Sequence, residues 1–126
     1  MNALGQHHLM ELYACDLAVI DALEAMRGHV LEAARKAGAT VVSEVFHKFA
    51  PQGVTGVVVL AESHLAVHSW PEHGYVAVDI FGCGKLDFVA CLDHLRVALG
   101  ASSATSQCIA RGDLAAIARH AALTAR

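Results

Sequence analysis

The amino-acid sequence predicts an α+β fold, a two-layer α/β sandwich in which an antiparallel sheet carries helices on one face. Short apolar stretches with strand-like spacing, about six in number, are mostly joined by turns, and two longer stretches have helical spacing. Hairpins and amphipathic helices pack together economically as two layers. With 126 residues, 56% of them hydrophobic, the chain suits one domain over residues 1–126.

The first predicted strand and helix precede residue 39. Residues 7–15 have strand-like spacing, and Asp16 stands where the N-cap of a helix is expected. Apolar residues then recur at helical spacing up to Gly38, a residue type that commonly ends helices. We therefore predict one long amphipathic helix. Gly28 in its interior costs about 1 kcal/mol relative to Ala and allows a bend or a close packing contact.

The middle of the chain predicts four strands. Residues 40–49 and 54–61 are rich in β-branched side chains, and a segment containing Pro and Gly separates them. Residues 65–70 and 75–81 flank a Pro-Glu-His-Gly turn, which predicts a hairpin.

The last third predicts a helix, a strand and a terminal helix. Asp87 can cap a helix whose apolar side chains share one face before Gly100. A short strand at 104–110 and a helix at 113–123 follow. The predicted order is therefore β-α-β-β and then β-β-α-β, with a helix at the end.

Composition excludes several classes of protein. The formal net charge is -3, so the chain lacks the positive field that nucleic-acid binding requires. Its apolar stretches are far shorter than the roughly 20 residues that span a bilayer, and its first residues lack the pattern of a secretory signal. Four dispersed cysteines fit free thiols in a reducing compartment. We expect a cytoplasmic protein with no nucleic-acid or membrane partner.

Residues 62–72 concentrate chemically active side chains, and four interpretations compete for them. A metal site built from His64 and His68 is disfavoured, because four residues of strand span about 13 Å. A serine hydrolase is disfavoured because Ser63 lacks a glycine-flanked elbow and an acid obviously placed to orient a base. The third interpretation is that Ser63 merely begins a strand and both histidines are ordinary polar groups.

A fourth interpretation comes from a family resemblance. The pattern ESHLAVHSWPEHGY at 62–75, continued by AVDIFGCG at 77–84, closely resembles the short prokaryotic form of S-adenosylmethionine decarboxylase, a self-processing pyruvoyl enzyme. Further matching stretches upstream are LG at 4–5, ELYACD at 11–16, GAT at 38–40 and FHKF at 46–49. The resemblance covers roughly the first 100 residues, and the tail after Gly100 has no counterpart.

The resemblance implies that the chain cuts itself between Glu62 and Ser63. The Ser63 hydroxyl would attack the Glu62 carbonyl to form an ester, and elimination would break that ester. Hydrolysis of the resulting dehydroalanine would leave a pyruvoyl group, with release of ammonia. Residues 1–62 would become the β chain and residues 63–126 the α chain. The pyruvoyl group is the one cofactor that we expect, and no metal is implied.

The resemblance also assigns the processing residues. His68 matches the proton acceptor in processing, and Thr55 occupies a supporting position that is more often serine in the family. Strict alternation along a straight strand would place Ser63 and His68 on opposite faces. We therefore expect Ser63 to lie in a bend before the regular strand.

In the mature enzyme the pyruvoyl group would form a Schiff base with the substrate amine and accept electrons as carbon dioxide leaves. Cys83 matches the family's proton donor, and its flanking glycines leave the thiol unshielded. We expect Cys15, Cys91 and Cys108 to be small buried apolar residues.

The resemblance also implies which residues bind the substrate. Phe49 and Trp70 match an aromatic pair that holds adenine, and Glu72 matches a carboxylate that binds the ribose hydroxyls. The family's sites are shared across a homodimer, with Phe49 and Glu72 supplied by the neighbouring subunit. The product would be decarboxylated S-adenosylmethionine, the aminopropyl donor for spermidine and hence polyamine biosynthesis.

Two rival functions remain open. Pyruvoyl-dependent ornithine or arginine decarboxylases use the same chemistry, but their substrates have no adenine for Phe49 and Trp70 to hold. An uncleaved relative that serves as a binding or regulatory partner is the other rival. Intact Ser63, His68 and Cys83 argue against it. Gln6, where relatives often carry a basic residue, is a further departure from the family pattern.

Denaturing electrophoresis tests self-cleavage directly. We expect two fragments of nearly equal size, of 62 and 64 residues, with the larger one blocked at its amino terminus. A single uncut chain that releases no carbon dioxide from any of the three substrates would contradict this prediction.

Overall fold

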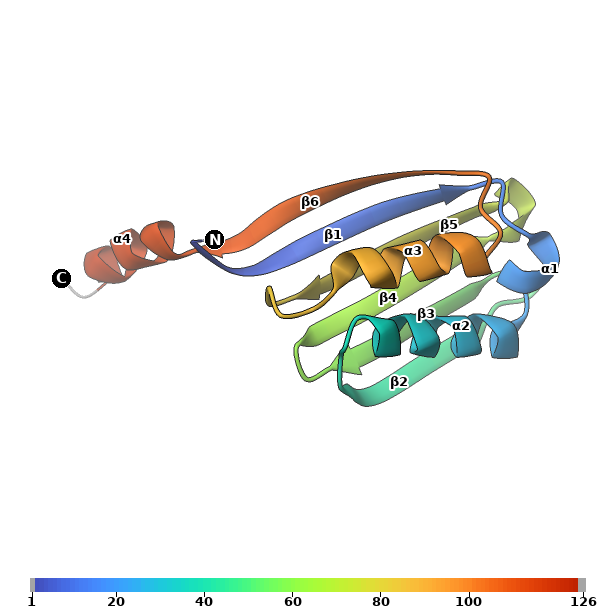
Figure 1. The fold of residues 1–126 in the computed structure, drawn as a ribbon, viewed down its shortest axis with the longest axis horizontal. Helices are drawn as coiled ribbons and strands as arrows, with labels where there is room; N and C mark the ends of the chain where they lie inside the picture. Colours follow the sequence, from blue (N-terminus) through green and yellow to red (C-terminus); the bar gives the residue numbers. More distant parts are fainter. Residues whose placement is uncertain (1, 125–126) are drawn as a thin grey trace.

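A six-stranded sheet in the order β2-β3-β4-β5-β1-β6 forms one layer of the molecule in a computed structural model that describes residues 2–124 (Figure 1). All neighbouring strands pair antiparallel. The strands are β1 (Ala3–Tyr13), β2 (Val41–Lys48), β3 (Val54–Leu60), β4 (Ser63–Trp70), β5 (Tyr75–Gly82) and β6 (Ser103–Asp113). The predicted α+β class is confirmed.

Helices cover one face of this sheet. Helices α2 (Leu23–Lys36) and α3 (Phe88–Ala98) lie across it side by side, and the short α1 (Leu17–Ile20) lies at one end (Figure 1). Helix α4 (Leu114–Thr124) follows β6 and projects beyond the sheet. A 3-10 turn (Pro71–His73) joins β4 to β5. None of the helices in the part of the chain described combines the length and the apolar character that crossing a membrane requires.

The core lies between the helices and the sheet, and alternation along each strand decides which side chains enter it. On β3, Val54 and Val58 are fully buried, whereas Val57 and Val59 on the opposite face are 38% and 43% exposed. No helix of the described chain covers that opposite face (Figure 1). We call it the open face.

The predicted elements are present, but some bounds differ and one helix is divided. Strand β1 covers Ala3–Tyr13 where the sequence predicts residues 7–15. The single helix expected from residue 17 to Gly38 is two helices, because Asp21 and Ala22 interrupt it. Ala22 is extended, with φ -100° and ψ 114°. The carbonyl of Ile20 accepts a hydrogen bond from Ser69 Oγ (2.7 Å) instead of continuing the helical ladder. A contact with β4 therefore overrides the helical spacing.

Both predicted helix caps are confirmed. The Asp16 carboxylate accepts from the amide of Ala18 (3.1 Å), and the Asp87 carboxylate accepts from the amide of Ala90 (3.0 Å). Strand β4 begins at Ser63, two residues before the predicted start.

Two glycines differ in what surrounds them. A Cβ built at Gly56 on β3 would collide with the ring of Phe46, which lies over it from β2. A Cβ at Gly28 in α2 would meet nothing within 4 Å, so the close contact considered there is absent. The first glycine is therefore required by packing, and the second only weakens a helix.

This contrast gives a matched pair of substitutions. Gly56→Ala should lower the free energy of unfolding by about 1–3 kcal/mol, because the Phe46 ring must move. Gly28→Ala should raise it by about 0.5–1 kcal/mol through better helix propensity. Urea unfolding curves of both variants and the parent measure the change, and equal midpoints for the two variants would refute the packing argument.

Candidate active site

The predicted site residues fall into two groups at opposite ends of β4. Ser63 opens this strand, whereas His68 and Trp70 lie near its far end. Five residues at about 3.3 Å each separate Ser63 from His68 by roughly 16 Å along a straight strand. One chain therefore does not bring these two side chains together. We call the two groups the cleavage end and the pocket end.

At the cleavage end, the peptide bond between Glu62 and Ser63 lies in a tightly held turn. Leu60 and Ser63 face each other across β3 and β4, which leaves two residues for the turn. The amide of Thr40 donates to the Glu62 carboxylate (3.0 Å), and the amide of Ala61 donates to the Thr40 carbonyl (2.9 Å). These bonds fix the residues before the predicted cut.

Ser63 itself has a strained backbone. Its φ of 153° lies in a region that glycine favours, and such a conformation in another residue costs of order 1–3 kcal/mol. The expectation that Ser63 precedes the regular strand is wrong, because Ser63 is the first residue of β4 and pairs with Leu60. The distortion lies within the strand, directly after the turn. Strain of this kind persists only when the surrounding structure imposes it.

Gly82, the residue before Cys83, lies beside the same peptide bond. His64 on β4 pairs with Phe81 on β5. Extending this antiparallel register by one residue places Gly82 opposite Ser63. A Cβ at Gly82 would lie 3.3 Å from the carbonyl oxygen of Glu62. The missing side chain therefore allows the two segments to approach. The Cys83 thiol is free and half-buried.

At the pocket end, Thr55 and His68 are direct cross-strand neighbours. Thr55 Oγ1 and His68 Nδ1 are 3.1 Å apart, within hydrogen-bond distance. Both side chains belong to the open face, since the residues that alternate with them, Val54 and Val67, are fully buried. The structure thus places the hydroxyl beside the imidazole, as the resemblance implies.

A cavity of about 340 Å³ adjoins this pair, within the size range of small-molecule pockets. It contains all three predicted substrate-binding side chains. The lining residues are Phe49, Gln52, Gly53, Thr55, His68, Ser69, Trp70 and Glu72. The Trp70 ring stacks on Tyr75, with centroids 5.4 Å apart. The sequence analysis missed Gln52, Gly53 and Ser69, whose pattern indicated only a turn and a strand.

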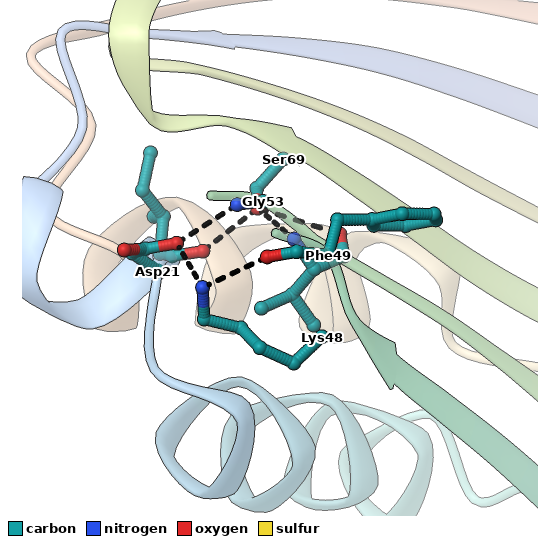
Figure 2. A network of polar contacts seen from close by, with 7 residues as sticks. Asp21, Lys48, Phe49, Gly53 and Ser69 are labelled. Atoms are coloured by element: carbon teal, nitrogen blue, oxygen red, sulfur yellow. Dashed lines mark hydrogen bonds and ion pairs between the residues drawn. The ribbon is translucent and has the colours of Figure 1, made fainter. Parts of the chain in front are cut away.

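Buried Ser69 joins three elements behind the cavity (Figure 2). Its hydroxyl donates to the Ile20 carbonyl (2.7 Å) and accepts from the amide of Val54 (2.9 Å). The neighbouring Asp21 carboxylate reaches Gly53 and Lys48 in the same network. Helix α1 is thereby tied to the ends of β2, β3 and β4.

A second polar cluster lies on the open face near Ser63. Asp79 Oδ2 is 2.9 Å from His7 Nε2 and 2.7 Å from His64 Nε2. Partial burial alone would raise the pKa of Asp79, but the two histidine hydrogen bonds outweigh it and hold that pKa below its ordinary value. The sequence analysis did not find this carboxylate for His64, because β5 lies far along the chain.

These three side chains are close enough to hold a metal ion, with ligand atoms within 4.8 Å of one another. The contact between Arg111 and His7 disfavours metal binding. Its Nη1 lies 3.2 Å from His7 Nδ1, and a guanidinium only donates, so the His7 proton belongs on Nε2, facing Asp79. A metal-bound histidine instead donates from its other nitrogen to an acceptor. The geometry favours a hydrogen-bonded chain of side chains. His64 contacts Asp79, whereas His68 contacts Thr55.

The remaining cysteines differ from one another. Burial raises the pKa of the Cys91 thiol to about 12, and that of the Cys15 thiol is raised for the same reason. Both are buried as expected. The expectation for Cys108 is wrong, because it is exposed on edge strand β6, where no further element covers it.

The fold and the site together define a class: a two-layer α+β protein with a strained serine directly after a turn, and an aromatic pocket at the far end of the same strand. The family model described as S-adenosylmethionine decarboxylase matches residues 6–112. The chain therefore belongs to the S-adenosylmethionine decarboxylase family.

Individual relatives agree with this assignment. The S-adenosylmethionine decarboxylase proenzyme of Caldicellulosiruptor saccharolyticus is 48% identical over 113 residues, which cover 89% of this chain and 91% of that protein. The proenzyme of the same name from Acetivibrio thermocellus is 55% identical over 68% of each chain. The crystal structure of the adenosylmethionine decarboxylase from Aquifex aeolicus VF5 superposes with a TM-score of 0.82 at 36% identity, covering 89% of this chain and 93% of that one.

Proposed function

We propose that this chain is a proenzyme that cuts itself between Glu62 and Ser63 and then decarboxylates S-adenosylmethionine. The observation that carries the proposal is the strained Ser63 backbone, which directly follows a turn held by Thr40 and approached by Gly82. The strained φ of Ser63, next to the bond to be broken, raises the energy of the uncut chain, and cleavage would release that strain. The relatives are named as proenzymes of this decarboxylase, which supports the same conclusion.

Self-cleavage would proceed in balanced steps. Ser63 Oγ adds to the Glu62 carbonyl carbon, the bond to Ser63 nitrogen breaks, and that nitrogen takes up the hydroxyl proton. A base then removes the Ser63 Cα proton while the bond from Cβ to Oγ breaks and Glu62 leaves as a carboxylate. Water converts the resulting enamine to a ketone and releases ammonia. His68 has the role of base, and Thr55 supports it at 3.1 Å.

Catalysis needs an electron sink that no ordinary side chain supplies. A pyruvoyl group at position 63 provides a reactive carbonyl that delocalises the electron pair left by carbon dioxide. Cys83 would return a proton to the substrate carbon, since its segment lies next to residue 63. Phe49 and Trp70 would hold the adenine, and Glu72 would accept hydrogen bonds from the ribose hydroxyls.

The separation of the two ends of β4 supports a homodimer. A second chain that packs its open face against the first, in the opposite direction, would bring its pocket end to the cleavage end of its partner. Exposed apolar side chains on that face suit such burial. They are Val45, Val57, Val59 and Ile109. Each site would then combine Ser63 and Cys83 of one chain with the pocket residues of the other. Trp70 would come from the same chain as Phe49 and Glu72, unlike in the expectation from the resemblance, because all three line one cavity.

The aromatic pocket also bears on the choice of substrate. Ornithine and arginine have no flat ring to lie between Phe49 and Trp70, so this pocket favours S-adenosylmethionine. The product would be the aminopropyl donor for spermidine. We also infer a cytoplasmic location, because the four cysteines form no disulfide.

Ser63→Ala tests the cleavage chemistry. We expect a folded, full-length chain that releases no carbon dioxide, because the variant lacks the attacking hydroxyl and the source of the ketone. Gel electrophoresis and a carbon dioxide assay with S-adenosylmethionine, ornithine and arginine measure both effects. Fragments from Ser63→Ala, or a parent enzyme that prefers ornithine or arginine, would overturn the respective assignment.

Complementation between two inactive chains tests the shared site. His68→Gln alone should cleave roughly 100-fold or more slowly, as expected for loss of a general base. Co-expression with a differently tagged Ser63→Ala chain should restore cleavage of the His68→Gln chain, because its partner supplies the imidazole. If the His68→Gln chain stays uncut in isolated mixed dimers, the two groups do not act across a dimer.

A further inference from the structure

The loop at residues 49–53, between β2 and β3, carries one wall of the pocket. Phe49 is 46% exposed, and its amide donates to the Gly53 carbonyl (2.8 Å), which closes the loop on itself. Gly53 has a φ of 107°, and a Cβ there would lie 3.2 Å from the carbonyl oxygen of Ser69. The bond that closes the loop does not fix its position relative to Trp70 on β4.

Asp21 supplies an anchor from outside the loop (Figure 2). Its Oδ1 accepts from the amide of Gly53 (2.8 Å) and lies 3.0 Å from Lys48 Nζ. The same ammonium group donates to the Phe49 carbonyl (3.2 Å). The hydrogen bonds from Gly53 and then Lys48 hold the pKa of Asp21 below its ordinary value. One charged carboxylate oxygen thus holds both ends of the loop.

The adjacent residue anchors the opposite wall. The Ile20 carbonyl accepts from Ser69 Oγ (2.7 Å), and Ser69 directly precedes Trp70. The interruption of the helix at Ala22 leaves both the Ile20 carbonyl and the Asp21 carboxylate free to meet the strands. Residues 20 and 21 therefore connect the two aromatic walls through a single turn.

We propose that Asp21 is a positioning residue that sets the separation of Phe49 and Trp70 for a flat purine ring. It is not among the residues that line the cavity, and it acts through Gly53 and Lys48. The inference rests on the proposed function, since it takes the pocket to be the nucleoside site. Self-cleavage does not depend on it, because Thr55 and His68 belong to strands rather than to the loop.

Trp70 makes binding measurable without turnover, because it is the one tryptophan of the chain. In the Ser63→Ala background, 5′-methylthioadenosine should quench its fluorescence on stacking. Asp21→Ala should weaken this binding roughly tenfold, as loss of a charge-assisted anchor implies. Asp21→Asn should weaken it less, because its carbonyl can still accept from Gly53. Lys48→Arg, which keeps the positive charge, should bind like the parent.

The matched control is Asp93→Ala, which removes a 62% exposed carboxylate paired with Arg96 on the surface of α3. It should leave binding unchanged. In the chain with Ser63 intact, Asp21→Ala should still cut itself fully and show a raised KM for S-adenosylmethionine, with kcat within about twofold.

Each result decides the inference. Binding by Asp21→Ala within twofold of the parent would overturn it, and if that variant does not fold, unchanged binding by Asp21→Asn and by Lys48→Ala would do so. Weakened binding with intact self-cleavage would support it. A parent that shows no quenching by 5′-methylthioadenosine would overturn the nucleoside pocket itself, which separates failure of the proposed function from failure of the Asp21 anchor.

Discussion

The rest of the site depends on the straightness of strand β4. A β-strand advances about 3.3 Å per residue and cannot fold back within eight residues, so Ser63 and Trp70 are held apart by the backbone itself. Pairing with β3 on one side and β5 on the other fixes the strand in the middle of the sheet. The strained residue after the turn and the aromatic cavity are consequently at separate places in one chain. In the homodimer that we propose, a second open face would bring them together as one site.

The order of strands explains how a chain could be cut in two and stay folded. Strand β1, from the segment before Ser63, lies between β5 and β6, which both come after it. Strand β3 pairs with β4 directly across the proposed cut. Pieces of about 62 and 64 residues are below the size at which a lone core becomes secure, roughly 70 to 80 residues. Interleaved strands give the two pieces a single core, which must form before cleavage.

Polar contacts refine a frame that apolar packing establishes. The buried Ser69 hydroxyl and the Asp21 carboxylate connect the end of α1 to three strand ends, and they do so at a break in the helix. On the open face, Arg111 sets the tautomer of His7, which in turn donates to Asp79. Both networks join residues from distant parts of the sequence, so each forms only after the sheet has assembled.

The sequence by itself determined the elements and the chemistry. Alternating apolar residues, the caps at Asp16 and Asp87 and the turn before Tyr75 are local signals, and all three correspond to observed structure. The family pattern around Ser63 is contiguous, so it predicts reactive residues in the same way. Only the tertiary structure decided the break at Ala22, the exposure of Cys108 and the separation of Ser63 from the pocket. These features depend on cross-strand register and on hydrogen bonds between distant segments, which local spacing does not encode.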